Sequence, residues 1–190
     1  MQWIIAWSLI GILFVLCILM VVVLIYWFHQ FRYSMSKDKI VFLPSNNRVV
    51  ADILDNLLIK YKVKFENNFL IEPGCGIANI SRYLSKYPWK NIWCIEYDKM
   101  TLAMAKLWNL WHKKNIQLMQ GDIFKLDLPA PSVIYCYLGQ EIVTKMYTTG
   151  KFKNSLVLSL SFNIKNGPKP TEIVKIRGFH QNLFVYDFRD

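Results

Sequence analysis

Residues 69–80 read FLIEPGCGIANI, an apolar run that leads directly into Glu72, Gly74 and Gly76. The run predicts a buried strand, and the two glycines let the backbone turn sharply and approach a ligand closely. A second acid, Glu96, lies in the sequence CIEYD at the end of the next apolar run. Nucleotide-binding βαβ units place an acid at this distance to accept hydrogen bonds from ribose hydroxyls. The spacing therefore indicates a site for a cofactor that contains a nucleoside.

Patterns typical of helices and strands alternate along the chain after residue 43. Strands are expected at 69–72, 91–96, 116–119, 132–137, 155–162, 172–177 and 183–188. Helices are expected at 44–58, 78–86, 100–113 and 139–148. Repeated strand–helix units predict an α/β fold with a mostly parallel sheet and helices on both of its faces. The last two strands predict an antiparallel hairpin at the edge of that sheet.

Three of these helices have an apolar side. The first has Ser45 as its expected N-cap, and we expect it to pack on the core through Val49, Val50, Ile53, Leu54, Leu57 and Leu58. The apolar side of the second consists of Ile80, Tyr83 and Leu84. The apolar side of the third consists of Ala103, Leu107, Leu110 and Trp111.

Residues 3–28 contain no charged side chain and could cross the hydrocarbon layer of a bilayer, which is about 30 Å thick, as a tilted helix. Trp3 and Trp7 near one end, and Tyr26 and Trp27 near the other, have rings that favour the membrane interface. The alternative is a signal peptide, but no basic residue precedes the stretch and no small-residue cleavage pattern follows it. We therefore divide the chain into a transmembrane anchor (1–30), a basic linker (31–43) and one domain (44–190).

Charge predicts the orientation of this anchor. Arg32, Lys37 and Lys39 follow the apolar stretch, whereas residues 1–28 carry no Lys or Arg. The positive-inside rule then places the domain on the cytoplasmic side of a bacterial inner membrane, or on the matrix side of a mitochondrial one. The formal net charge of +10 belongs to the part outside the bilayer, where anionic lipid head groups would attract it. A nucleic-acid partner is the weaker alternative, because the lysines are scattered and accompany no nucleic-acid-binding motif.

Cysteine and histidine are dispersed along the chain. The cysteines are Cys17, Cys75, Cys94 and Cys136, and the histidines are His29, His112 and His180. No Cys-x-x-Cys pair occurs. We therefore expect neither a disulfide framework nor a metal site.

The motifs and their order resemble the class I S-adenosylmethionine-dependent methyltransferases. The first motif of that family, acid-x-Gly-x-Gly-x-Gly, falls on Glu72, Gly74, Gly76 and Ala78, with alanine in place of the third glycine. The resemblance covers residues 41–190, although the usual helix between the fifth and sixth strands is reduced here to a loop. It implies a Rossmann-like sheet that ends in an antiparallel hairpin, with S-adenosylmethionine as cofactor.

The resemblance also implies how the cofactor is bound. Glu72 would neighbour the ammonium group of its amino-acid part, the backbone of the glycine turn would face the methionine and ribose, and Glu96 would bind the ribose hydroxyls. Asp122 would accept a hydrogen bond from the adenine amino group. The complete set of predicted cofactor-binding residues is Glu72, Gly74, Cys75, Gly76, Ile77, Glu96, Tyr97, Gly121, Asp122 and Ile123.

Two alternatives apply to this cofactor site. Asp122 could simply cap a turn, since Gly-Asp is a common turn pair. The whole site could bind NAD, but the NAD fingerprint has glycine at the position of Asn79, and the chain has no room for a substrate domain. Both observations favour methyl transfer over hydride transfer.

The carboxyl end of the strand at 132–137 is where a methyl acceptor would lie. Tyr135, Tyr137 and Glu141 are the candidate catalytic residues, because hydroxyls and carboxylates beside a desolvated lysine help it to lose its proton. The alternative is that both tyrosines are core residues. The family's Asn-Pro-Pro-Tyr motif is absent, since residues 135–138 read YCYL. Its absence disfavours adenine, cytosine and glutamine as acceptors.

A narrower resemblance concerns the entry into the domain. The apolar N-terminal segment and residues 41–50, with Phe42, Pro44 and Ser45, are similar to the membrane-anchored protein-lysine methyltransferases of ATP synthase c subunit and adenine nucleotide translocase. Those enzymes favour an acid before the third glycine, whereas this chain has Ile77. The resemblance implies a membrane-protein lysine as acceptor. A lipid-like or isoprenoid acceptor, and a cofactor-binding module without catalysis, are the alternatives.

Overall fold

The computed structural model describes residues 2–34, 47–112, 114–176 and 181–189. The chain divides into two units, Met1–Leu43 and Pro44–Asp190, and each is described here by itself. The expectations for Phe42, Pro44 and Ser45 lie outside the described residues.

The first unit contains a single long helix, α1 (Gln2–Ser34), among its described residues. Within it, Ile10–Phe28 is long and apolar enough to cross a membrane, and none of this stretch is buried against other parts of the chain. A signal sequence would meet the same criteria of length and composition.

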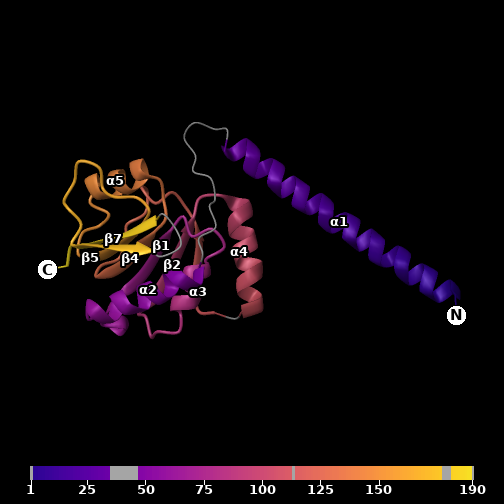
Figure 1. Cartoon of the computed structure of the whole chain (residues 1–190), viewed down its shortest axis with the longest axis horizontal. Helices are drawn as coiled ribbons and strands as arrows, with labels where there is room; N and C mark the ends of the chain where they lie inside the picture. Colours follow the sequence, from indigo (N-terminus) through magenta and orange to yellow (C-terminus); the bar gives the residue numbers. More distant parts are fainter. Residues whose placement is uncertain (1, 35–46, 113, 177–180, 190) are drawn as a thin grey trace. The chain divides into compact units, whose positions relative to one another are not determined.

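The second unit is built on a seven-stranded sheet, shown in Figure 1, with the order β3-β2-β1-β4-β5-β7-β6. The strands are β1 (Phe69–Pro73), β2 (Asn91–Glu96), β3 (Gln117–Gln120), β4 (Ser132–Cys136), β5 (Ser155–Leu160), β6 (Glu172–Ile176) and β7 (Gln181–Asp187). The first five strands pair in parallel, and β7 runs antiparallel to both β5 and β6. The expected α/β architecture and C-terminal hairpin are therefore confirmed. Residues 161–171, between β5 and β6, form a loop, as the sequence indicated.

One helix of this unit precedes the first strand, and the other three connect parallel strands. They are α2 (Asn47–Lys60), α3 (Asn79–Leu84), α4 (Lys99–His112) and α5 (Gln140–Thr148), and a short 3-10 helix, η1 (Phe65–Asn67), precedes β1. Figure 1 shows α2 and α3 together on one side of the sheet and α5 on the other. The predicted apolar side of α2 is confirmed, because Val50, Leu54, Leu57 and Leu58 are buried in one cluster with residues of α3 and of the central strands.

The apolar side of α4 does not pack on the sheet. Leu107, Leu110 and Trp111 are 71%, 74% and 86% exposed, whereas the buried residues of this helix are Thr101, Leu102 and Ala105. The helix packs on β2 and β3 through small or short side chains, which allow its axis to approach the sheet. Its larger apolar side consequently faces away from the sheet.

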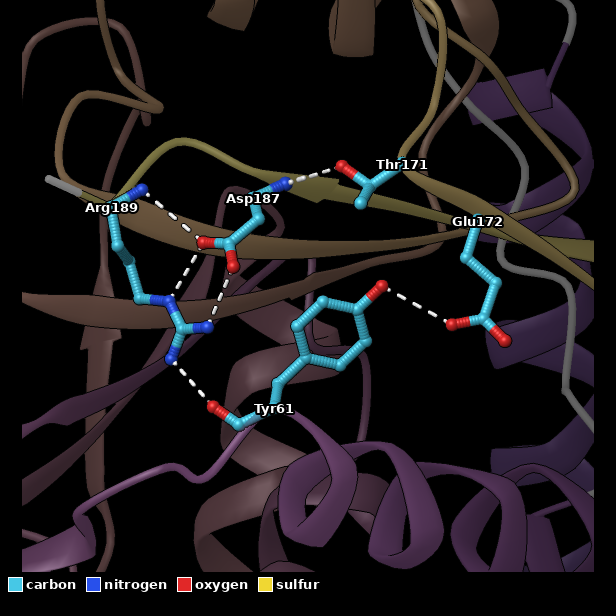
Figure 2. Close-up of polar contacts among 5 residues, drawn as sticks. All are labelled: Tyr61, Thr171, Glu172, Asp187 and Arg189. Atoms are coloured by element: carbon cyan, nitrogen blue, oxygen red, sulfur yellow. Dashed lines mark hydrogen bonds and ion pairs between the residues drawn. The ribbon is translucent and has the colours of Figure 1, made fainter.

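A group of polar side chains joins the C-terminal hairpin to the end of α2 (Figure 2). Arg189 donates two hydrogen bonds of 2.7 Å to the carboxylate of Asp187 and one of 3.1 Å to the backbone oxygen of Tyr61. The Tyr61 hydroxyl donates to Glu172 in β6, which also pairs with Lys60. We call Tyr61, Glu172, Asp187 and Arg189 the hairpin clamp. Arg189 lowers the pKa of Asp187, and Lys60 lowers that of Glu172.

Candidate cofactor site

The candidate site lies at the carboxyl ends of β1 and β2, near the centre of the sheet. From β1 the chain crosses to β2 on one side, and β4 pairs with β1 on the other. In open α/β sheets, ligands bind at the carboxyl edge where the direction of the crossovers changes. Glu72 is near the end of β1, and Glu96 is the last residue of β2.

The turn after β1 requires its glycines. Gly74 and Gly76 have φ angles of +64° and +56°, in the left-handed region that glycine adopts without strain. A Cβ atom on Gly74 would lie 2.4 Å from Cδ2 of Leu138, so the Leu138 side chain would have to shift to admit it. Ala78, at the position of the missing third glycine, has a φ of +58° and is fully buried. The backbone of the glycine pattern is therefore kept even where the glycine is lost.

Glu72 is a buried carboxylate. Its Oε2 accepts a hydrogen bond of 3.0 Å from the backbone N–H of Ser81 and another from the Ser81 hydroxyl, both in α3. Burial raises the pKa of Glu72 to about 7, although the Ser81 hydrogen bonds and the charge of Arg82 act in the opposite direction. A carboxylate in this state gains free energy from any cation that approaches it.

Arg82 supplies only part of that compensation. Its Nη2 donates to Asn79 Oδ1, and its buried Nη1 has no hydrogen-bond partner among the described residues. Burial lowers the pKa of Arg82, and the charge of Glu72 opposes this shift. The two groups therefore interact through space, and no hydrogen bond between them neutralises the carboxylate.

Glu96 links the glycine turn to the start of α4. Its Oε2 accepts a hydrogen bond of 2.9 Å from the Gly76 N–H, and its Oε1 accepts one of 2.9 Å from the Asp98 N–H. Asp98 in turn accepts hydrogen bonds of 2.8 Å from the N–H and hydroxyl of Thr101, in the first turn of α4. Burial raises the pKa of Glu96. The carboxylate is thus fixed in position by two backbone donors at the edge of the site.

The Gly121-Asp122-Ile123 segment follows β3 at the same edge of the sheet. The Gly121 N–H donates to the backbone oxygen of Glu96 over 3.1 Å. One carboxylate oxygen of Asp122 accepts a hydrogen bond of 3.0 Å from the Phe124 N–H, so Asp122 does cap a turn. Asp122 and Ile123 are half-buried, and Tyr97 is 57% exposed. The structure therefore joins Glu96 and Gly121 directly and leaves Tyr97 open to solvent.

Cys75 lies beneath the turn, beside Cys94 of β2. Both thiols are buried, and Ile77 near them is half-buried. Hydrogen bonding to Cys94, together with burial, raises the pKa of Cys75 well above its usual value. The Cys75 thiol thus stays protonated and contributes packing and backbone geometry to the turn. In the described parts of the chain, no group of three or more His, Cys, Asp or Glu side chains is placed to hold a metal ion.

The three candidate catalytic residues differ in their surroundings. Tyr135 is 2% exposed and belongs to the hydrophobic core between the sheet and α2. Tyr137, just beyond β4, is half-buried; it stacks on Phe162, and its hydroxyl accepts a hydrogen bond of 3.1 Å from Gln181. Glu141 is exposed in the first turn of α5. The position of Tyr135 agrees with the alternative that it is a core residue.

Sequence reasoning missed two residues that organise the site. Ser81 holds Glu72, and Asp98 connects Glu96 to α4. The sequence around Asp98 did carry a signal, because Asp followed three residues later by Thr is typical of a helix start. No sequence signal indicated Ser81, because its contact with Glu72 depends on how the chain folds back after the glycine turn.

Comparison with solved structures identifies the fold. An RNA methyltransferase from Salinibacter ruber, in complex with S-adenosyl-L-homocysteine, is similar with a TM-score of 0.63 and 19% identity, over 78% of this chain and 95% of that one. A SAM-dependent methyltransferase from Aquifex aeolicus gives a TM-score of 0.53 at 12% identity, over 69% and 87%. A dimethyladenosine transferase from Plasmodium falciparum gives 0.51 at 16% identity, over 70% and 59%.

Sequence comparison adds no closer assignment, because the chain matches no family model and no curated protein. The likeness to these solved structures is therefore one of fold. The second unit of this chain has the class I fold of S-adenosylmethionine-dependent methyltransferases.

Proposed function

We propose that the protein is an S-adenosylmethionine-dependent methyltransferase that is anchored in a membrane and methylates a lysine of a membrane-associated protein. Dependence on this cofactor is supported by a pair of acids, Glu72 and Glu96, at the ends of two adjacent central strands. Glu96 accepts a hydrogen bond from the glycine turn, and Glu72 accepts one from the helix that follows the turn. The fold similarity to methyltransferases also supports this dependence.

The charge state of Glu72 fits the amino-acid part of this cofactor. Its carboxylate is buried with a pKa of about 7 and has no hydrogen-bonded cation among the described residues. The cofactor carries an ammonium group and a sulfonium, and when bound it supplies the methyl group in an electrophilic form. The ammonium would favour the ionised form of Glu72, directly or through water. Binding would then be favoured, because the ammonium would offset the free-energy cost of burying the charge of Glu72.

The positions of Glu96 and Asp122 fit the nucleoside part. Each Glu96 oxygen accepts one backbone hydrogen bond, and a carboxylate oxygen has a second lone pair with which it could accept from a ribose hydroxyl. Asp122 uses one oxygen for its turn, which leaves acceptor capacity for an adenine amino group. Tyr97 and Ile123 would lie against the ring. Gly74, Cys75, Gly76, Ile77 and Gly121 would contribute backbone and close approach.

The acceptor is inferred from what surrounds the site. Residues 135–138 lack the motif that binds planar amides and bases, which favours an aliphatic amine. We propose that Tyr137 and Glu141 contact this amine. The hydroxyl of Tyr137 is held by a hydrogen bond from Gln181. Glu141 follows four residues later, and its carboxylate is exposed in the first turn of α5. They would orient the amine and accept its proton, directly or through water. Tyr135 would support them from the core.

The anchor gives the reaction its location. The candidate span Ile10–Phe28 in α1, followed by Arg32, would hold the basic domain at the inner membrane surface. Confinement to that surface raises the effective concentration of a membrane substrate without any new contact. A membrane-associated protein is therefore the favoured acceptor. The similarity to RNA methyltransferases makes RNA the second candidate, supported by the net charge of +10.

The test uses the full-length protein in lipid nanodiscs. Calorimetric titration with S-adenosylhomocysteine should show binding, and titration with NAD should show none. Incubation with methyl-labelled S-adenosylmethionine and native membranes should then place the label in a protein band, at lysine by mass spectrometry. Label in the organic phase would support a lipid acceptor, label in RNA would support the second candidate, and binding without transfer would support a module without catalysis.

A matched pair of variants checks that the signal comes from this site. Glu96→Ala removes the proposed ribose ligand, whereas Glu172→Ala removes an acid of the hairpin clamp on the other part of the sheet. The first should abolish transfer, and the second should leave the affinity for S-adenosylhomocysteine unchanged. Equal effects of the two variants would contradict the site assignment.

A further inference from the structure

The outer side of α4 is an apolar surface that the proposed reaction does not use. Five of its large apolar side chains are exposed, at 40%, 71%, 51%, 74% and 86% for Met104, Leu107, Trp108, Leu110 and Trp111 respectively. In the described part of the second unit, the other exposed large apolar side chains are Ile59 in α2, Tyr97 between β2 and α4, and Ile173 in β6. Single exposed residues of this kind are ordinary, whereas a contiguous group marks an interaction surface.

Helical geometry shows that these five side chains form one band. Met104, Leu107, Trp108 and Trp111 follow the spacing i, i+3, i+4 and i+7, which places them on one side of a helix with about 100° per residue, and Leu110 widens that band. The buried residues Leu102 and Ala105 lie on the opposite side. We call the five exposed residues the α4 band. Figure 1 shows α4 at the margin of the domain, and its main contacts among the described elements are with β2 and β3.

The charged side chains of α4 and of the segment that follows it are all basic. From Lys99 to Gly121 the sequence contains four lysines and no acid, and Lys99, Lys106 and Lys114 are exposed. In a helical projection, Lys99 and Lys106 lie beside Leu110, at the border of the band. A helix with tryptophan and leucine on one side and lysine at the border has the composition of helices that lie in the interface of an anionic membrane.

The length of the chain keeps this surface near a bilayer. Residues 35–46 separate α1 from α2 in the sequence, and at roughly 3.3–3.6 Å per residue they can span no more than about 40 Å. A domain held by α1 in a membrane therefore cannot move away from the lipid head groups by more than about its own diameter. A lipid surface is the partner that is always present at that distance, in contrast to a soluble protein.

We propose that the α4 band docks on the surface of an anionic lipid bilayer, with its apolar side chains among the head groups and Lys99, Lys106 and Lys114 facing lipid phosphates. This proposal deepens the proposed function, since it rests on the membrane anchor. It also connects the membrane to the cofactor site, because the Asp98 that begins α4 donates its N–H to Glu96. Docking therefore fixes the orientation of the helix that follows the predicted ribose ligand.

The experiment is photocrosslinking of the full-length protein in nanodiscs that contain a diazirine phospholipid, with one part in four of phosphatidylglycerol or with phosphatidylcholine alone. Crosslinked peptides are mapped by mass spectrometry. The peptide that contains α4 should be labelled in the anionic discs, and labelling should fall at least roughly fivefold in phosphatidylcholine discs or at high salt, because the lysine attraction is screened. Peptides of α5 serve as the unlabelled reference.

The variants Trp108→Ser/Trp111→Ser and Ile59→Ser are a matched pair, since all three side chains are exposed and their loss should leave the fold intact. The first should reduce labelling of α4 at least roughly fivefold, and the second should leave it unchanged. Equal labelling of α4 in all variants, or its crosslinking to a second protein in place of lipid, would overturn the proposal.

Labelling of α1 distinguishes this inference from the proposed function. Labelled α1 with unlabelled α4 would overturn docking and leave the anchor standing. Unlabelled α1 with labelled α4 would overturn the transmembrane anchor and leave docking standing. If neither helix is labelled, both proposals are wrong.

Discussion

The acids of the candidate cofactor site and those of the hairpin clamp have opposite electrostatic environments. Burial raises the pKa of Glu72 and Glu96, whereas basic partners lower the pKa of Asp187 and Glu172. The clamp acids thus favour the folded state through interactions that are already made. The site acids are held by hydrogen bonds from backbone N–H groups and a serine, and their charge is left for a ligand to compensate. The comparison indicates which acids stabilise the protein and which are available for binding.

The largest expected effect is on cofactor binding at Glu96. Glu96→Ala should weaken the binding of S-adenosylhomocysteine by about 2 to 4 kcal/mol, because two charge-assisted hydrogen bonds to the ribose would be lost and the Gly76 and Asp98 N–H groups would lose their acceptor. Calorimetric titration measures the change. Unchanged affinity would remove Glu96 from the site and with it the contrast between the two groups of acids.

Glu72→Gln should affect stability and binding in opposite directions. The folded-state pKa of about 7 lies above the ordinary value of 4.5, so the folded protein holds a proton that the unfolded chain releases, and the free energy of unfolding falls as pH rises between these two values. At pH 8 the variant should therefore be more stable than the parent by about 1 to 3 kcal/mol, while it binds cofactor at least roughly tenfold less tightly.

Chemical denaturation at pH 5 and pH 8 tests this prediction for Glu72. The difference in stability between variant and parent should be small at pH 5 and present at pH 8. In the parent, affinity for the cofactor should rise with pH through about 7, because the cation prefers ionised Glu72. A variant that is less stable than the parent at pH 8 would show that Glu72 resembles the clamp acids.

Arg189→Ala should show the reverse behaviour. Loss of its hydrogen bonds to Asp187 and to the Tyr61 backbone should destabilise the protein by about 1 to 3 kcal/mol and leave cofactor affinity unchanged. The lowered pKa of Asp187 contributes stability above the ordinary value of 3.8, and this stability is lost as pH falls below it. In denaturation from pH 6 to pH 2, the variant should consequently lose less stability than the parent. An altered cofactor affinity would contradict the separation of the two regions.

The smallest expected effect concerns Ala78. Ala78→Gly would remove the strain of an alanine in the left-handed region, which costs about 1 to 2 kcal/mol. Two effects oppose this gain: the loss of a buried methyl group, which contributes about 0.8 kcal/mol, and the greater flexibility of the unfolded chain. The net change in the free energy of unfolding should be within about 1 kcal/mol of zero. A larger destabilisation in thermal melting would show that the methyl group is essential to the packing of the turn.

The sequence predicted the elements of the sheet because apolar runs and glycine turns are local signals. Every expected strand was confirmed to within a few residues, including Asn91–Glu96 with both of its bounds. The sequence failed where the outcome depends on packing. For α4 it identified the side with Leu107 and Trp111 as apolar, but periodicity does not show whether such a side faces the sheet or the solvent.

The candidate site was predicted only in part for a related reason. Glu72 and Glu96 could be found from their spacing, since both lie at strand ends that the sheet brings together. The hydrogen bonds from Ser81 and the burial of Tyr135 could not be found, because they depend on side-chain packing around the turn and the core. Their roles become visible only in three dimensions.

The hairpin clamp has a consequence for association between molecules. The strand β6, which carries Glu172, is at the edge of the sheet and, among the described residues, pairs with β7 alone, so its outer backbone groups have no strand partner there. Charged side chains such as Glu172 and Lys175 disfavour the addition of a strand from another molecule. When the clamp is broken, the C-terminal hairpin would lose its side-chain contacts with the end of α2, and the protein would be expected to aggregate at a rate that rises with its concentration. The clamp therefore helps to protect this edge of the sheet as the protein folds.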